Sequence, residues 1–231
     1  KKLDFKNSTM YVTLEPCTHY GLTPPCSKII KEKKINKVYF CEEDPDKRVY
    51  KKAKKALNKN KIFAKKINLK NNFYKSYFLN KKKGLPLVDA KIAISKDNYT
   101  INKKNKWITN SRSRKVGHLL RSRYDSIIST SYTINKDNSL LNCRIKGLNN
   151  HKPDLIIIDR HLKLKKNLAL FKILNKRKTY ILTTSNDKKK INYFKKKKIK
   201  IIKINSLGNK DDFIILLKRL FNLGKRRLLV E

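Results

Sequence analysis

The sequence predicts an α/β protein with two domains. Short runs of β-branched or aromatic residues alternate with Lys-rich amphipathic stretches, which is the pattern of strands placed between helices. A charged run meets Gly and Pro in the stretch Lys81-Lys82-Lys83-Gly84-Leu85-Pro86, directly before a new strand. We therefore expect one domain over residues 1–83 and a second over residues 84–231. A chain of 231 residues is long enough for each of them to bury a core.

The positions of the expected elements follow from the same alternation. Strands are expected at Tyr11–Leu14, Lys37–Phe40, Leu87–Ile94, Ser126–Ser129, Leu155–Ile158, Thr179–Leu182, Ile199–Ile204 and Arg227–Val230. Helices are expected at Ser27–Lys33, Val49–Asn58, Ser111–Arg123 and Asp211–Phe221, with Ser111 and Asp211 as N-caps. We expect the protein to continue at both ends, because residue 1 is not Met and residue 231 directly follows a strand.

The charge is strongly positive. Sixty Lys and Arg residues against 17 Asp and Glu give a formal net charge of +43, which on its own favours a polyanion such as nucleic acid. However, Lys is spread over nearly every expected element, and basic patches interleaved with aromatic residues are missing. We interpret the charge as mostly a genomic codon bias and expect no specific nucleic-acid partner. Without a long apolar run or a signal-peptide pattern, we also expect a cytoplasmic protein that does not enter a membrane.

Two of the four cysteines flank a distinctive segment. Cys17 follows a strand and a Pro, and Cys26 lies at the start of a helix, where thiolates are favoured. Two thiols alone are more often small buried hydrophobic groups, and a catalytic zinc site needs a third protein ligand and a water. Four irregularly spaced cysteines do not predict a disulfide framework.

The residues around these cysteines change that interpretation. The pattern Leu-Glu-Pro-Cys-x-His-x-Gly-x-Thr-Pro-Pro-Cys over residues 14–26 closely resembles the zinc motif of the riboflavin-pathway deaminases. The resemblance implies that Cys17 and Cys26 bind Zn²⁺. It also implies that a His-Ala-Glu element, with the third ligand and the catalytic Glu, precedes Lys1, so no catalytic residue is expected in this chain.

Other residues of this first domain follow from the same resemblance. His19 is a fourth zinc ligand, a surface residue or a substrate contact, and the resemblance favours the contact. Asp44 matches an element that holds the substrate ribose, although it could equally be a turn before a helix. In two places the chain departs from the family, which weakens the expectation of phosphate contacts in this domain: Leu22 replaces a basic residue, and Lys51 with Ala53 replaces a pair of glycines.

The second domain resembles the dihydrofolate-reductase-like reductase of the same family. Residues 88–97 resemble its first strand, which implies a substrate contact for Lys91 and a cofactor contact for Ala93. The segment Asn105-Lys-Trp107-Ile-Thr109 resembles its cofactor segment, with Trp107 on NADPH and Asn105 on the substrate. A Lys on a strand is otherwise a solvated edge residue, and a single Trp is usually part of a core.

Three further motifs complete this resemblance. Arg121 matches the substrate-binding Arg of an L-R-x-x-x-D-A-I pattern, and helical spacing places Arg114 on the same face. The stretch from Thr133 to Arg144 resembles T-x-x-x-D-x-P-x-L-x-x-R, with Ser139 in place of Pro. These motifs, together with those at residues 155–160 and 228–231, imply NADPH contacts from Thr133, Asp137 and Arg160, and substrate contacts from Arg121, Leu141, Arg144 and Glu231.

The order of these motifs supports one hypothesis. The chain is identified as a member of the bifunctional riboflavin-biosynthesis deaminase/reductase family: a partial cytidine-deaminase-like α/β/α domain followed by a dihydrofolate-reductase-like α/β domain. The resemblance implies a Zn²⁺-dependent hydrolase and an NADPH-dependent oxidoreductase acting on a phosphorylated pyrimidine, and a homo-oligomer is compatible with it. Two alternatives remain, namely a reductase-only or inactive product and a basic RNA-binding module. Paired guanidinium groups suit a phosphate, so we expect Arg121 and Arg144 to converge on it.

Overall fold

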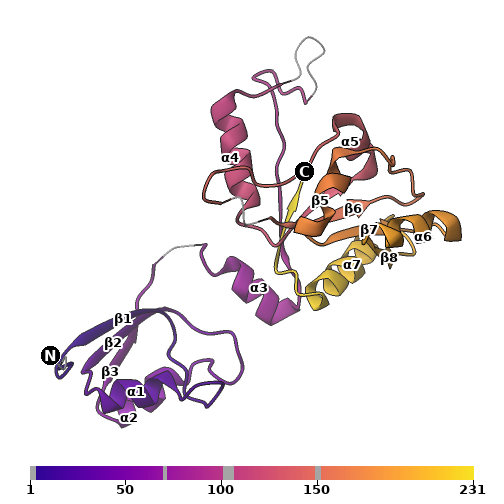
Figure 1. Cartoon of the computed structure of the whole chain (residues 1–231). Coiled ribbons are helices and arrows are strands. Elements are labelled where there is room, and N and C mark those ends of the chain that lie inside the picture. The colour runs from indigo at the N-terminus through magenta and orange to yellow at the C-terminus, as the bar shows by residue number, and fades with distance from the viewer. Residues whose placement is uncertain (1–3, 70–71, 101–106, 149–151) are drawn as a thin grey trace. The chain divides into compact units, whose positions relative to one another are not determined.

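The computed structural model describes residues 4–69, 72–100, 107–148 and 152–231. The chain forms two compact units, Lys1–Lys83 and Gly84–Glu231. Each unit is built on a sheet of its own (Figure 1), and every strand pair in both sheets is parallel. The α/β class is thereby confirmed.

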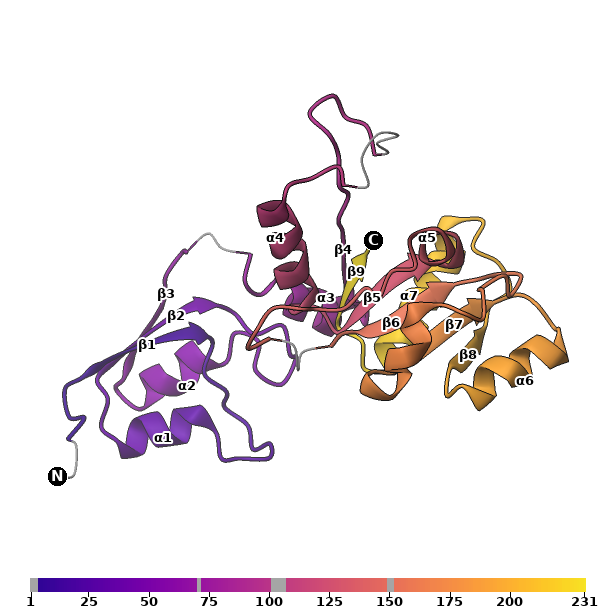
Figure 2. The ribbon, with the colours of Figure 1, turned by 45° about the horizontal axis from the view of Figure 1, so that its top comes forward.

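Unit 1 contains a three-stranded sheet in the order β1 (Thr9–Leu14), β2 (Lys37–Glu42) and β3 (Phe63–Lys66). The helices α1 (Cys26–Glu32) and α2 (Ala53–Lys59) lie on the same side of this sheet in Figures 1 and 2, and α3 (Lys75–Lys83) ends the unit. The strand residues Val38 and Ala64 pack with Ile30 of α1 and Leu57 of α2 in one core. These contacts fix α1, whose first residue, Cys26, ends the predicted zinc loop.

Unit 2 contains a six-stranded sheet in the order β4-β9-β5-β6-β7-β8. The last strand of the chain therefore lies between β4 and β5, pairing Val88 with Leu228 on one side and Ile128 with Val230 on the other. The strands are β4 (Leu87–Ala90), β5 (Ser126–Thr130), β6 (Asp154–Ile158), β7 (Thr179–Thr183), β8 (Lys200–Lys203) and β9 (Arg227–Val230).

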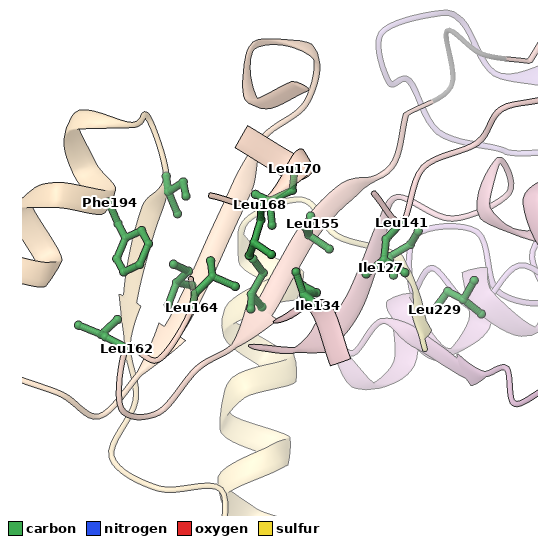
Figure 3. Close-up of a cluster of buried hydrophobic side chains, with 13 residues drawn as sticks. Ile127, Ile134, Leu141, Leu155, Leu162, Leu164, Leu168, Leu170, Phe194 and Leu229 are labelled. Carbon is green, nitrogen blue, oxygen red and sulfur yellow. The ribbon is translucent and has the colours of Figure 1, made fainter. Parts of the chain in front are cut away.

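Helices cover both faces of this sheet, as is usual for a parallel sheet. One face packs against α7 (Lys210–Asn222) through Leu216 and Leu220. The opposite face carries a larger core, drawn in Figure 3, that contains Ile134, Leu170 and Phe194. These residues belong to α5 (Ser131–Asp137), the 3₁₀ helix η1 (Ala169–Lys176) and α6 (Lys188–Lys196), and α4 (Ser111–Arg121) packs on the same core through Leu120.

Several sequence-based expectations were wrong in detail. The strand β4 ends at Ala90 rather than at residue 94, because its ladder with β9 ends at the pair Ala90–Val230. The expected N-caps are displaced: the side chain of Asn110 caps α4 by accepting from the Ser113 N–H at 2.8 Å, and Asn209 caps α7 by accepting from the Asp212 N–H at 2.9 Å. In each case an Asn just before the expected cap provides the acceptor.

Other elements were missed. The strand β3 and the helices α3, α5, η1 and α6 were not predicted, because they are short or so rich in Lys that periodicity does not reveal an apolar face. Within the described residues, no helix is both long enough and apolar enough to cross a bilayer.

Candidate functional site

The two cysteines of the predicted zinc motif lie at opposite ends of one loop in unit 1. Cys17 comes shortly after β1, and Cys26 is the first residue of α1. The loop folds back on itself: the backbone N–H of Cys26 donates to the Cys17 Sγ at 3.2 Å, and that of Ser27 donates to the Cys17 carbonyl at 3.1 Å. Cys17 is half-buried and Cys26 is exposed. The two thiols can therefore be reached from solvent at this loop.

The thiols suit a cation, although they do not by themselves form a complete site. Partial burial and the neighbouring Cys17 thiol raise the pKa of Cys26, contrary to the lowering expected at a helix start. Zn²⁺ would reverse this effect, because it binds the thiolate form. Within the described residues, no group of three or more His, Cys, Asp or Glu side chains is placed to hold a metal ion. Cys17 and Cys26 thus fit zinc as two ligands of a larger set.

His19 lies in the same loop and is half-buried. Its Nδ1 atom is buried, with no hydrogen-bond partner among the residues that the structure describes. Within the described residues His19 is not part of a group of three or more metal-binding side chains, and the role of fourth zinc ligand stays an untested alternative. An unsatisfied buried nitrogen suits contact with a bound molecule, so the substrate contact stays a prediction.

A buried carboxylate that sequence analysis did not single out organises this unit. Glu15 is 4 % exposed. Its side chain accepts backbone N–H groups from Asp44 at 3.3 Å, Lys51 at 3.0 Å and Ala53 at 2.9 Å. Lys51 has a φ of 56°, in the region that favours glycine, and this turn delays the start of α2 from the expected Val49. Glu15 therefore holds the loop that carries Asp44.

Asp44 itself is buried and already has protein partners. Its Oδ1 accepts from the Tyr77 hydroxyl at 2.9 Å and from the Asp46 backbone N–H at 2.9 Å. Burial and the Asp44 carboxylate raise the pKa of Tyr77, while hydrogen bonds from Arg48 hold the pKa of Asp46 well below its usual range. Asp44 is thus a fixed, ionisable group, and its contact with a ribose stays a prediction.

In unit 2, five predicted or neighbouring side chains form one network, which we name the edge cluster: Lys91, His118, Arg121, Arg144 and Glu231. Lys91 and Glu231 directly follow the adjacent strands β4 and β9, so both lie at the carboxyl edge of the sheet. Ligands bind at this edge in open parallel sheets. His118 and Arg121 come from α4, whose Gly117 lies close to Lys91: a Cβ there would be 3.9 Å from the Lys91 Cε.

Glu231 and Arg121 form the tightest pair in this cluster. Arg121 donates from Nε to Oε1 and from Nη2 to Oε2 of Glu231, both at 2.7 Å, and the Lys91 Nζ lies 3.5 Å from Oε2. Burial raises the pKa of Glu231, but the hydrogen bonds and charges of Arg121 and Lys91 outweigh it and lower the pKa overall. The Arg121 fork is therefore engaged by a carboxylate of the protein itself.

His118 and the backbone of Asn142 connect this pair to Arg144. The His118 Nδ1 lies 2.9 Å from the Asn142 carbonyl oxygen, which also accepts from the Arg121 Nη1 at 3.3 Å. The Arg144 Nη2 lies 3.2 Å from the His118 Nε2. Arg121 and Arg144 thus converge on one histidine, and Arg144 is the exposed member of the two.

The segment that carries Arg144 is held by a second residue that the sequence did not reveal. Arg177 is buried and donates to the carbonyls of Leu140 and Leu141, the latter at 2.7 Å. Burial lowers the pKa of Arg177 to about 10, and the charge of Arg121 adds to this effect. Leu141 has a φ of 47° and its side chain points into the core beside Ile127 (Figure 3). Its contact with a substrate stays a prediction.

The predicted cofactor residues come from four segments. Trp107 is 55 % exposed, and the guanidinium carbon of Arg114 lies 4.5 Å from its ring centroid. Thr133 lies in α5, where its hydroxyl oxygen is 3.1 Å from that of Thr130, and Asp137 is the last residue of that helix.

Arg160 is exposed just after β6, so it also lies at the carboxyl edge. Ala93 is half-buried after β4, and Asn105 lies outside the described residues. That these residues contact NADPH or substrate stays a prediction.

Comparison with known proteins decides the family. The family model of the RibD C-terminal domain matches residues 86–231, which is most of the chain. The chain belongs to this family. A second model, the zinc-binding region of cytidine and deoxycytidylate deaminases, matches residues 1–42 and includes both loop cysteines.

Individual RibD proteins are similar to this chain over much or all of its length. The RibD of Actinobacillus pleuropneumoniae is 29% identical over the whole chain, and the chain covers 62% of that protein. The RibD of Buchnera aphidicola subsp. Baizongia pistaciae is 36% identical over 65% of the chain, which covers 42% of that protein. The chain thus spans less than two thirds of the length of these relatives.

Solved RibD structures share the fold. A diaminohydroxyphosphoribosylaminopyrimidine deaminase/5-amino-6-(5-phosphoribosylamino)uracil reductase from Thermotoga maritima aligns with a TM-score of 0.78 at 26% identity, covering 99% of this chain and 63% of its own. Acinetobacter baumannii RibD also gives 0.78, at 24% identity, covering 98% of this chain and 63% of its own. The family and the fold expected from the RibD motifs are confirmed.

Proposed function

We propose that this chain supplies the NADPH-dependent reductase of a bifunctional riboflavin-biosynthesis enzyme, together with the zinc-binding loop of its deaminase. The observation that carries the proposal is the edge cluster, which lies at the carboxyl edge of the sheet in the unit that matches the RibD C-terminal domain. It combines an exposed guanidinium with a fixed carboxylate, and these groups suit a sugar phosphate.

The residues of the edge cluster are assigned different roles in binding the substrate. Arg144 is exposed and presents N–H donors to the substrate phosphate. Arg121 keeps Glu231 ionised and oriented, and Lys91 adds a second positive charge next to it, so that Glu231 can accept hydroxyl groups of the opened ribose. We therefore assign Arg121 to orienting Glu231, and its expected direct contact with the phosphate stays a prediction.

NADPH, when bound, supplies the hydride that converts the ribosyl group to ribityl. The carboxyl edge of the sheet fits a dinucleotide, and Arg160 is an exposed cation there that suits the 2′-phosphate. The ring of Trp107, the Thr133 hydroxyl and the Asp137 carboxylate are the groups that we assign to orienting the nicotinamide cofactor, with Ala93 beside them.

In unit 1, Cys17 and Cys26 would hold Zn²⁺, which supplies an activated water for deamination of the phosphorylated pyrimidine. The assignment of Zn²⁺ to this loop rests on its two thiols, which the hydrogen bond from the Cys26 N–H to the Cys17 Sγ brings close together. The substrate contacts assigned there are His19, through its unpartnered Nδ1, and Asp44.

The two units make a matched test. Asp137→Ala in the intact protein should weaken NADPH binding, measured by nucleotide fluorescence, while leaving the zinc content measured by atomic absorption unchanged. The double variant Cys17→Ser/Cys26→Ser should do the reverse. Loss of both properties in either variant would indicate a folding defect, and a wild-type protein that neither binds NADPH nor oxidises it with 5-amino-6-(5-phosphoribosylamino)uracil would overturn the proposal.

The role of Arg144 in phosphate binding is tested by the substrate KM of its variants. Arg144→Ala should raise the substrate KM by at least about tenfold, since a lost charged hydrogen bond costs about 1.5–3 kcal/mol, with NADPH affinity unchanged. Arg144→Lys should restore part of the loss, because it supplies charge without the fork. A wild-type substrate KM in both variants would contradict the phosphate assignment.

A further inference from the structure

His118 lies inside the edge cluster, and the sequence motifs discussed above assigned it no role. Its ring contacts Arg121 on its own helix and Arg144 on the segment after α5, and Glu231, which pairs with Arg121 and Lys91 at the sheet edge, also acts on its charge. The pKa and the tautomer of a histidine are set by the charges and hydrogen bonds around its ring.

The contacts of the two ring nitrogens assign the tautomer. The Asn142 carbonyl oxygen, 2.9 Å from Nδ1, can only accept a hydrogen bond, so Nδ1 carries the proton. The Arg121 Nη1 lies farther from Nδ1, at 3.4 Å, and donates to the same carbonyl oxygen at 3.3 Å. The guanidinium N–H groups of Arg144 can only donate, so Nε2, at 3.2 Å, must be unprotonated and accept. The ring is therefore neutral, since a protonated ring would set two donors against each other.

We infer that His118 is a positioning residue for the reductase: its neutral Nδ1–H tautomer holds the Arg144 guanidinium in place for the phosphate of the substrate. The catalytic part of this inference rests on the proposed reductase function, whereas the contact between His118 and Arg144 stands on the geometry alone.

The surroundings of His118 keep its ring neutral. Partial burial lowers the pKa of His118, and the charges of Arg121 and Arg144 lower it further, against the opposing effects of the Asn142 carbonyl and Glu231. At neutral pH, therefore, Nε2 remains available as an acceptor.

Holding Arg144 matters because a free arginine loses rotamer freedom when it binds an anion. Two of its N–H groups are anchored in the structure, one on the His118 Nε2 and one on the Asn142 Oδ1 at 3.4 Å. The remaining N–H groups of the exposed guanidinium stay available for a ligand. The Arg144 side chain is thus ordered before the phosphate binds, so that the binding free energy of the substrate does not have to offset this loss of rotamer freedom.

The contact can be tested by NMR of the intact protein labelled with ¹⁵N in its four histidines, where His118→Gln identifies the His118 signals. We expect the neutral Nδ1–H pattern at pH 7 and a pKa that rises in Arg144→Ala. Arg112→Ala, an exposed arginine on the same helix, is the matched control and should leave that pKa unchanged. An Nε2–H tautomer, a protonated ring at pH 7, or a pKa unmoved by Arg144→Ala would overturn the inference.

Kinetics test the role in substrate binding. His118→Leu removes both hydrogen bonds of the ring but leaves the Arg144 charge in place, so it should raise the substrate KM by less than Arg144→Ala does, up to about tenfold, with kcat and the NADPH KM unchanged. His118→Gln keeps an acceptor near the Nε2 position and should restore most of the loss. Parallel loss of kcat, NADPH affinity and thermal stability in both variants would indicate a general structural role and contradict positioning.

The two experiments separate the possible failures. If the wild-type protein shows no reductase activity while the NMR results hold, the proposed function is wrong and the His118–Arg144 contact remains. If the wild-type protein is active but His118→Leu has a normal substrate KM, the proposed function stands and the positioning role is wrong.

Discussion

Each unit holds a carboxylate with little exposure next to its candidate site, Glu15 in unit 1 and Glu231 in unit 2, and the two are satisfied in opposite ways. Glu15 in unit 1 accepts three backbone N–H groups. Glu231 in unit 2 accepts the Nε and Nη2 donors of Arg121 and lies 3.5 Å from the Lys91 Nζ. Each carboxylate needs its set of hydrogen-bond donors, because an unpaired buried charge is strongly unfavourable.

The difference shows what each carboxylate can do. A carboxylate held by backbone amides fixes the path of the chain, so Glu15 shapes the loop around Asp44 and the start of α2. A carboxylate held by side-chain cations keeps free lone pairs and responds to its charged neighbours, so Glu231 belongs to a site that can bind and titrate. Truncating these groups should therefore affect stability in unit 1 and both stability and ligand binding in unit 2.

The largest expected effect is that of Glu15→Ala. It leaves three backbone donors without their acceptor, each costing about 1–3 kcal/mol, and unit 1 should lose on the order of 4 kcal/mol of unfolding free energy. Hydrogen exchange of the β1–β3 amides measures this locally. The control Glu32→Ala removes an exposed carboxylate 3.8 Å from Lys28 and should change little. Equal protection of these amides from exchange in both variants would show that Glu15 does not hold the loop in place.

Arg121→Ala should come next, at about 3 kcal/mol in unit 2, because it leaves the Glu231 carboxylate, 6 % exposed, with Lys91 alone. Trp107 is the only Trp of the chain, so its fluorescence follows the unfolding of unit 2 in denaturant. Arg123→Ala, on an exposed side chain just after α4, is the control. Similar midpoints for the two variants would show that the ion pair adds no stability.

The pH dependence should separate the units further. The pKa of His118 is lowered in the folded state, so the unfolded chain takes up this proton first, and unit 2 should lose stability as the pH falls below about 6.5. The lowered pKa of Glu231 extends the loss below about pH 4.5. Trp107 fluorescence unfolding at a series of pH values measures it. His118→Gln should remove the first part of the slope, and an unchanged slope would contradict the assignment.

The smallest effect concerns Lys51, whose φ of 56° favours glycine. Lys51→Gly should relieve this conformation and stabilise unit 1 by up to about 1 kcal/mol, read from hydrogen exchange around α2. Lys55→Gly, inside α2, is the matched control and should destabilise by about 1 kcal/mol. Destabilisation by both would show that the Lys51 side chain compensates for its strained backbone.

The sequence alone determined the elements with clear local signals. The strands at Lys37, Ser126, Leu155 and Thr179 begin at or within one residue of their expected starts, because alternation and β-branched runs act over short distances. The motifs around Cys17 and from Thr133 to Arg144 identified the RibD family for the same reason, since each is continuous in sequence. Short Lys-rich elements such as β3 and α6 were not predicted, because they are stabilised by packing against neighbouring elements rather than by a local sequence signal.

Tertiary structure decided the partners of the charged groups. Periodicity placed Arg121 on a helix face, but only the insertion of β9 between β4 and β5 brings Glu231 to it across 110 residues. Glu15 and Arg177 gave no local signal because their partners are backbone atoms of distant segments, and His118 gave none because its Asn142 and Arg144 partners lie more than 20 residues away. Sequence patterns report which face of an element is apolar, whereas hydrogen-bond pairing of a buried charge depends on the register and order of strands that the chain brings together only on folding.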